Sequence, residues 1–148
     1  FDGDLVIVGK LGWKYEPIIE RIRASPRAER IKCFHDVPDF ELPALYSGAD
    51  LFMTTSFYEG FGFPPLEAMA CGTPVIATSG SSFTEALEDA AILVDSSDPE
   101  SWCATAEKVL SDMDLRKSLI SKGYSQAAGF TWGETARKTW DVFNRVMG

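Results

Sequence analysis

Short apolar segments alternate with segments of helical periodicity along the first two thirds of the chain. The apolar segments are too short for helices and are rich in Val, Ile and Phe, as strands are. They are Leu5–Val8, Arg30–Phe34, Asp50–Met53, Pro74–Ala77 and Ala91–Val94. Strands that alternate with helices without hairpin turns indicate a parallel sheet covered on both faces. We therefore predict an α/β fold in which Leu5–Val8 is a buried strand.

Helical spacing fills the intervals between these strands. We predict a helix over residues 15–24 and a second that starts at Pro38, with Asp39 as its N-cap. A third opens at Pro64-Pro65 and closes at Gly72. After Pro99 only helical patterns remain, over residues 99–111, 113–128 and 132–146. We expect this helical tail to pack onto the sheet through Trp132, Trp140, Phe143 and Val146.

Composition excludes several classes of protein. The chain has 148 residues, the usual size of one domain, and a formal net charge of −8. Such a charge argues against a nucleic acid or an anionic membrane surface as partner. No apolar run is long enough to span a bilayer. Three widely spaced cysteines suggest free thiols in a reducing compartment, so we expect a cytoplasmic location, with the inner face of the membrane as the alternative for the intact protein.

Ligands of parallel sheets bind beyond the carboxyl ends of the strands. This rule selects the loops Gly9–Trp13, His35–Asp39, Thr54–Pro65 and Thr78–Thr84. Gly9 and Gly12 do not have the spacing of a dinucleotide-binding fingerprint, which disfavours a dinucleotide oxidoreductase. The densest concentration of chemistry is the stretch Ser56–Glu67.

Two glutamates and a glycine loop define that stretch. Pro64 and Pro65 prevent one continuous helix from carrying both Glu59 and Glu67. With Pro65 at the first helical position, the amides of Leu66 and Glu67 would be free to bind an anion such as a phosphate. Carboxylates beside a phosphate site suit a ligand that also carries hydroxyls, because a carboxylate accepts several O–H bonds. A sugar nucleotide has both groups.

Simpler explanations exist for each residue taken alone. Glu67 would favour a helix start without any ligand, through the helix dipole. Gly60 and Gly62 would form a tight turn. The whole string, placed between a strand and a proline-started helix, favours the ligand site.

The segment Tyr58–Ala77 resembles the signature of family-four retaining glycosyltransferases, in which seven residues separate two glutamates. Leu5–Gly9, Pro43–Asp50 and Phe130–Ala136 resemble other parts of the family. These enzymes have the GT-B fold, with two Rossmann-like domains that face each other across a cleft. The resemblance implies that residues 1–148 are a single donor-binding domain, the C-terminal half of a GT-B fold with a helical tail. The family's N-terminal acceptor domain and the first strand and helix of the donor domain have no counterpart here, which would leave a gap beside Leu5–Val8.

The resemblance also assigns roles to residues. Glu59 is similar to the catalytic carboxylate near the donor hexose, and Glu67 to the residue that holds the ribose hydroxyls. The other donor-binding residues would be Gly60, Phe61 and Gly62 at the hexose and diphosphate, Leu66 at the diphosphate through its amide, and Val37 and Asp39 at the base. The family chemistry requires no metal ion or cofactor in this domain.

The implied function is transfer of a hexose, with its anomeric configuration retained, from a nucleoside-diphosphate sugar to a glycan or lipid-linked acceptor. The stretch Val8–Trp13 is loosely similar to bacterial polysaccharide mannosyltransferases, so GDP-mannose is the first suggestion for the donor. The alternatives are a starch or glycogen synthase-like glucosyltransferase that uses ADP- or UDP-glucose, and a non-catalytic interaction domain of the same fold. We expect these residues to transfer no sugar by themselves, because the acceptor side of the site would be missing.

Overall fold

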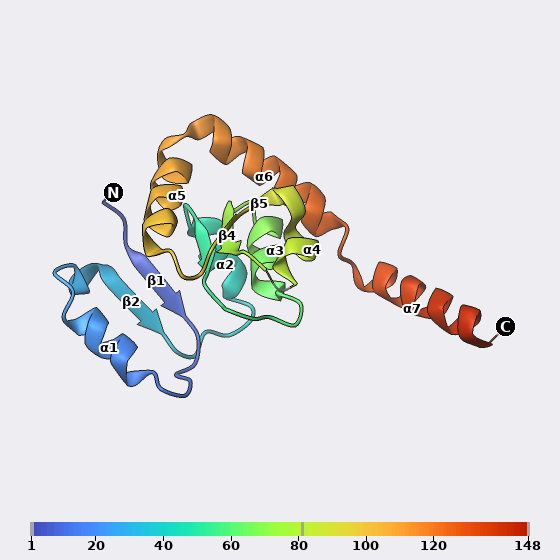
Figure 1. The fold of residues 1–148 in the computed structure, drawn as a ribbon, viewed down its shortest axis with the longest axis horizontal. Coiled ribbons are helices and arrows are strands. Elements are labelled where there is room, and N and C mark those ends of the chain that lie inside the picture. Colours follow the sequence, from blue (N-terminus) through green and yellow to red (C-terminus); the bar gives the residue numbers. More distant parts are fainter. Residues whose placement is uncertain (1, 81, 148) are drawn as a thin grey trace. The chain divides into compact units, whose positions relative to one another are not determined.

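A computed structural model describes residues 2–80 and 82–147, which fall into two compact units (Figure 1). Unit 1 comprises residues 1–42 and unit 2 residues 43–148. All strand pairs are parallel among the described residues, and helices connect them. The predicted α/β class is confirmed.

Unit 1 is a single strand–helix–strand crossover. It contains β1 (Leu5–Val8), α1 (Glu16–Arg23), a short 3-10 helix η1 (Ala28–Arg30) and β2 (Ile31–Phe34). The two strands run parallel, with Leu5 opposite Ile31. Arg30 forms ion pairs with Asp2, at 3.2 Å, and with Asp4, which tie the start of the chain to the start of β2.

The prediction that β1 is a buried strand is wrong. Its four side chains are 37–45% exposed, and α1 contains no buried residue. β1 pairs with β2 alone among the described strands. An apolar run thus predicts the strand correctly here, but the residues that would bury it are not provided by unit 1.

Unit 2 contains a three-stranded sheet in the order β3-β4-β5. Its elements are α2 (Leu42–Gly48, which begins at the unit boundary), β3 (Phe52–Thr54), α3 (Phe63–Ala70), β4 (Val75–Thr78), α4 (Phe83–Leu87), the 3-10 helix η2 (Glu88–Ala90), β5 (Ala91–Val94), α5 (Pro99–Ser111), α6 (Met113–Ala128) and α7 (Trp132–Met147). The central strand β4 is buried at every position. Phe52 of β3 lies opposite Val75, and Ala91 of β5 lies opposite the same residue.

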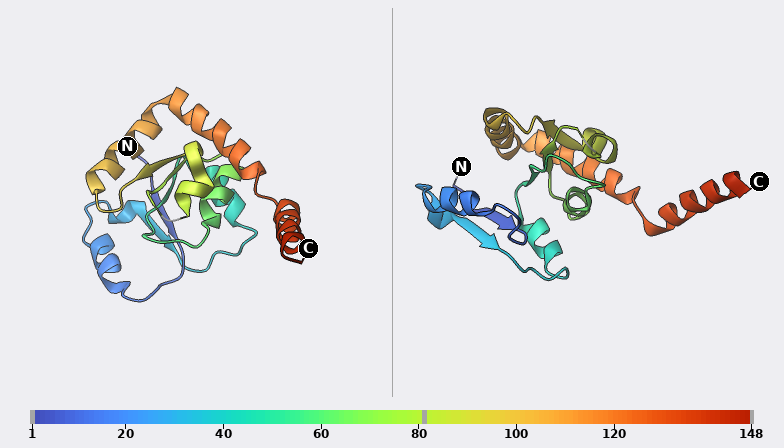
Figure 2. Two further views of the ribbon diagram at one scale, coloured as in Figure 1. Left: turned by 45° about the vertical axis from the view of Figure 1, so that its right-hand side comes forward. Right: turned by 60° about the horizontal axis from the view of Figure 1, so that its bottom comes forward.

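Two hydrophobic clusters cover the two faces of this sheet. Val75 and Ala77 of β4 join α3 and α4 in one cluster, in which Phe83 and Met69 are the largest buried side chains. Ile76 points the opposite way and joins Trp102, Val109 and Leu119 of α5 and α6. Burial of each large side chain stabilises the fold by about 1.5–3 kcal/mol. Helix α6 also runs alongside α3, as Figure 2 shows, and completes the packing.

The starts of α5 and α6 follow directly from capping residues. The Asp98 carboxylate accepts a hydrogen bond from the amide of Ser101 at 3.0 Å, and Asp112 accepts one from the amide of Leu115 at 2.9 Å. These N-caps satisfy amides that the helices leave without a partner. The predicted bounds of both helices are confirmed.

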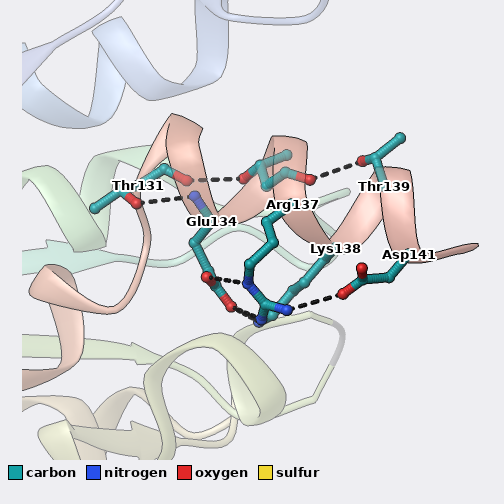
Figure 3. A network of polar contacts seen from close by, with 7 residues as sticks. Thr131, Glu134, Arg137, Lys138, Thr139 and Asp141 are labelled. Carbon is teal, nitrogen blue, oxygen red and sulfur yellow. Dashed lines mark hydrogen bonds and ion pairs between the residues drawn. The ribbon is translucent and has the colours of Figure 1, made fainter.

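A network of polar contacts runs along the last helix, α7 (Figure 3). Thr131 accepts a hydrogen bond from the amide of Glu134 at 3.1 Å, and Arg137 forms ion pairs with Glu134 and Asp141. The helix has no buried residue, and the side chain of Trp132 is 80% exposed. The expectation that its apolar residues, Trp132, Trp140, Phe143 and Val146, pack it onto the sheet is therefore wrong. Across the described residues, no helix combines the length and the apolar character that crossing a membrane requires.

Candidate functional site

A glycine loop joins the carboxyl end of β3 to α3 in unit 2. Its last residue, Gly62, is the N-cap of α3 and has a φ of +90°, in the left-handed region that favours glycine. A Cβ atom at this position would overlap Cε1 of Phe83 and lie 2.9 Å from Cδ1 of the same ring, which is almost fully buried. Gly60 is different, because a Cβ there would meet no atom within 4 Å. The fold thus requires glycine at 62 but not at 60.

Helix α3 begins at Phe63, two residues before the predicted start. In an α-helix the N-cap carbonyl accepts the first bond, so the amide of Leu66 pairs with Gly62 and that of Glu67 with Phe63. The prediction of free amides at Leu66 and Glu67 is therefore wrong. Gly62 and Phe63 are at the N-cap and the first helical position, so their amides have no partner in the helix, and Pro64 and Pro65 at the next two positions have no amide hydrogen.

A serine from the neighbouring strand loop holds the glycine loop in place. Oγ of Ser82 lies 3.0 Å from the carbonyl oxygen of Glu59 and 3.1 Å from that of Phe61, and the two acceptors share its one hydroxyl hydrogen. Ser82 directly precedes α4, at the carboxyl side of β4. Two of the loops that the sequence selected are thus connected by side chain to backbone contacts.

Replacement of Ser82 by alanine should loosen the glycine loop. The loss of this hydroxyl is expected to lower the free energy of unfolding by about 0.5–1.5 kcal/mol and to speed amide hydrogen exchange in residues 59–62. The control is Ser125→Ala, because among the described residues Oγ of Ser125 bonds to a carbonyl of its own helix alone. Hydrogen exchange of the loop at the wild-type rate in Ser82→Ala would show that Ser82 does not hold it.

The two glutamates of the motif are held by different contacts. Glu67 lies on the exposed side of α3, where its Oε2 accepts a hydrogen bond from the hydroxyl of Tyr46 at 3.0 Å. Burial of Tyr46, followed by the hydrogen bond to Glu67, raises the pKa of this phenol well above its ordinary value. Glu59 is half-buried in the loop, where its backbone accepts from Ser82. That both carboxylates face one cleft stays a prediction.

The residues predicted to contact the base belong to unit 1. Val37 is half-buried and Asp39 is exposed in the loop after β2. Asp39 is not a helix N-cap as predicted, because a turn closed by the hydrogen bond from the amide of Glu41 to the carbonyl of Pro38 precedes α2. In the same unit, Nδ1 of His35 lies 3.2 Å from the carbonyl oxygen of Gly9. The role of Val37 and Asp39 at the base stays a prediction.

A groove of about 390 Å³ lies away from the motif, along β3 and α5. It is lined by Met53, Thr55, Ser96, Pro99, Trp102, Cys103 and Ala106. These groups are mostly apolar and include none of the predicted site residues. The groove therefore does not suit a diphosphate.

The structure places further residues beside the motif that the sequence pattern did not identify. Phe63 packs against the predicted site residue Phe61 with the rings tilted and their centroids 4.8 Å apart, and Phe130 packs edge-on against Phe61 at 5.6 Å. Tyr46 and Ser82 contact the motif from 21 and 23 residues away in the sequence. The sequence signal for both was indirect: Tyr46 lies in the segment Pro43–Asp50, and Ser82 in one of the selected loops. Within residues 2–80 and 82–147, no group of three or more His, Cys, Asp or Glu residues is placed to hold a metal ion.

Residues 2–126 match the protein family described as glycosyl transferases group 1. This match covers most of the chain and includes β1 to β5 and the whole glycine loop. The chain belongs to this family of glycosyltransferases, and its fold is the Rossmann-like parallel sheet, flanked by helices, of a GT-B domain. The resemblance inferred from the motif is confirmed.

The individual relatives are all glycosyltransferases by name, but they are named for different reactions. The chain is 34% identical to O-antigen chain mannosyltransferase B of Escherichia coli over 94% of its own length and 36% of that protein. It is 38% identical to D-inositol 3-phosphate glycosyltransferase of Salinispora arenicola, over 72% of this chain and 24% of the relative. The chain thus spans about a third or less of the length of these two relatives.

Solved structures confirm the fold. Sucrose-phosphate synthase from Thermosynechococcus elongatus superposes with a TM-score of 0.86 at 25% identity, over 98% of this chain and 39% of that one. HepE from Anabaena, solved in complex with UDP-glucose, superposes with a TM-score of 0.71 at 20% identity, over 84% of this chain and 36% of that one.

Proposed function

We propose that the chain binds the sugar donor of a retaining glycosyltransferase that transfers a hexose from a nucleoside-diphosphate sugar to a glycan or lipid-linked acceptor. The observation that carries the proposal is the loop from Glu59 to Gly62, which Ser82 holds at the carboxyl edge of a parallel sheet. Family membership supports glycosyl transfer, and the loop supports a diphosphate site at this edge of the sheet.

Different residues bind different chemical groups of the donor. Amides of the glycine loop and of Phe63 donate to the diphosphate, helped by the positive end of the α3 dipole. Glu67 accepts the ribose hydroxyls, and Glu59 lies at the hexose and the reaction centre. The family resemblance assigns the base to Val37 and Asp39. Leu66 is buried on α3, in the same hydrophobic cluster as Phe83. This scheme needs no metal ion bound by the chain.

GDP-mannose is the proposed donor, because a mannosyltransferase is among the relatives at 34% identity. UDP-glucose is the second candidate, because a solved structure with this fold was obtained as its complex. The acceptor would be a growing polysaccharide or a lipid-linked glycan.

A retaining reaction predicts that the sugar in the product keeps the anomeric configuration that it has in the donor. Proton NMR of the product measures this configuration directly.

A panel of nucleotides on the full-length protein tests the proposal. GDP and GDP-mannose at about 100 times their Kd should stabilise the protein by ~2.7 kcal/mol, measured as a rise in Tm. UDP, UDP-glucose, ADP and ADP-glucose should stabilise it less, and inorganic pyrophosphate should have the smallest effect. A protein that responds to none of the nucleotides, or to pyrophosphate as strongly as to GDP, contradicts a donor site. A stronger response to UDP-glucose would move the assignment to a glucosyltransferase.

A further inference from the structure

Two contacts hold Tyr46 in place, one at its backbone and one at its ring. Its carbonyl oxygen accepts a hydrogen bond of 2.5 Å from Oγ1 of Thr73, a threonine that is 2% exposed. Its ring packs edge-on against Phe52 of β3, with ring centroids 5.6 Å apart at an angle of 74°. The backbone bond and the ring contact together determine where the hydroxyl points.

The fixed hydroxyl is bonded to one oxygen of Glu67. The distance from Tyr46 Oη to Glu67 Oε2 is 3.0 Å, and within the described part of the chain no other hydrogen bond or ion pair reaches the Glu67 side chain. A tyrosine hydroxyl is protonated at neutral pH, and the surroundings of Tyr46 raise its pKa further, so the phenol donates and the carboxylate accepts. The remaining lone pairs of the carboxylate face no partner in the described residues.

An exposed glutamate on a helix ordinarily samples several rotamers, because three side-chain bonds rotate. A hydrogen bond from an anchored donor selects one of them before any ligand arrives. Preorganisation of this kind lowers the cost of binding, since the side chain does not have to be ordered by the ligand. The chain therefore has the parts of a positioning pair, one residue that touches the ligand and one that orients it.

We propose that Tyr46 is a positioning residue that orients Glu67 to accept the ribose hydroxyls of the donor. The inference rests on the proposed function and adds to it a residue outside the motif. Tyr46 itself does not touch the donor. Its effect should appear only for ligands that have ribose hydroxyls, which separates it from a general role in folding.

The test compares two ligands on two variants of the full-length protein. Tyr46→Phe removes one oxygen and keeps the ring that packs on Phe52. Calorimetry with GDP should show affinity roughly three- to tenfold weaker than in the wild type. With 2′,3′-dideoxy-GDP the variant and the wild type should bind equally, because Glu67 has no hydroxyl to accept. The matched control is Tyr124→Phe, a half-exposed tyrosine on α6, which should bind both ligands as the wild type does. The same comparison with UDP and 2′,3′-dideoxy-UDP covers a uridine donor.

Each contrary result has a distinct meaning. If Tyr46→Phe lowers the affinity for GDP and for the dideoxy analogue equally, Tyr46 has a purely structural role and the proposal is overturned. It is also overturned if the Tyr46→Phe variant binds GDP as tightly as the wild type does. A wild-type protein that binds GDP and its dideoxy analogue equally would overturn the ribose role of Glu67 together with this proposal. A protein that binds neither would contradict the donor site itself. Combining Tyr46→Phe with Glu67→Ala should cost little more than Glu67→Ala alone, because the alanine variant already lacks the carboxylate that Tyr46 orients.

Discussion

Replacement of Gly62 by alanine is expected to lower the free energy of unfolding by about 2–5 kcal/mol. Two costs add at this position. The backbone has a φ of +90°, which is unfavourable for any residue with a Cβ atom, and the new methyl group would overlap the buried ring of Phe83. The ring cannot move aside easily, because its side chain is only 1% exposed. The glycine loop should therefore shift and lose donor binding as well as stability.

Two other glycines of the same region separate these costs. Gly80 has a φ of +100°, but a Cβ atom there would meet no atom within 4 Å, so Gly80→Ala tests backbone strain alone. Gly60 has neither problem, and Gly60→Ala should leave stability nearly unchanged. Denaturant unfolding of the three variants should rank Gly62→Ala as the least stable and Gly60→Ala as the most stable. Gly62→Ala no less stable than Gly80→Ala would mean that the close approach of the loop to Phe83 has no energetic consequence.

The elements that the sequence predicted best are those with strong local signals. β5 has the predicted bounds, and α5 and α6 begin after aspartates that cap them. Proline at position 99 fits the first turn of α5, where its missing amide hydrogen costs nothing. Local pattern was less reliable at α3, because two adjacent prolines are compatible with more than one helix start.

Burial was harder to predict, because it depends on neighbours that the local pattern does not show. The apolar runs of β1 and β4 look alike in sequence, yet β4 is buried at every position and β1 is exposed. The difference is that β4 lies between β3 and β5 with helices on both faces, whereas β1 has one partner strand among the described residues. The apolar residues of α7 are a second case, because they have helical spacing and yet none of them is buried.

The motif located the candidate site, but not the contacts that fix it. Glu59, Gly62 and Glu67 are close together in sequence and could be found by spacing alone. Tyr46 and Ser82 act on them across 21 and 23 residues, through a helix and a loop that approach only when the sheet forms. Such contacts follow from tertiary structure, so one sequence can suggest the segments but not the hydrogen bonds.

The two glutamates should differ in the kinetic parameter they control. Glu67→Ala in the full-length protein should weaken nucleoside diphosphate and nucleotide sugar alike, because the ribose is common to both. Loss of a hydrogen bond to a charged group costs roughly 1.5–3 kcal/mol, or about ten- to a hundredfold in affinity. Glu59→Ala should leave the affinity for the diphosphate nearly unchanged and reduce turnover on the order of a hundredfold. An interaction that strengthens in the transition state acts on turnover rather than on binding.

Calorimetry with GDP and UDP, beside steady-state rates with the matching sugar nucleotides, measures both effects. The control is Glu107→Ala, an exposed glutamate on α5 whose loss should change neither quantity. The structure supports different behaviour, because Glu67 is held from α2 by Tyr46 while Glu59 belongs to the loop that Ser82 holds. Equal loss of diphosphate affinity in both variants would mean that the glutamates act as one unit around the loop. The separate roles at the ribose and at the hexose would then be wrong, although the loop could still bind the diphosphate through its amides.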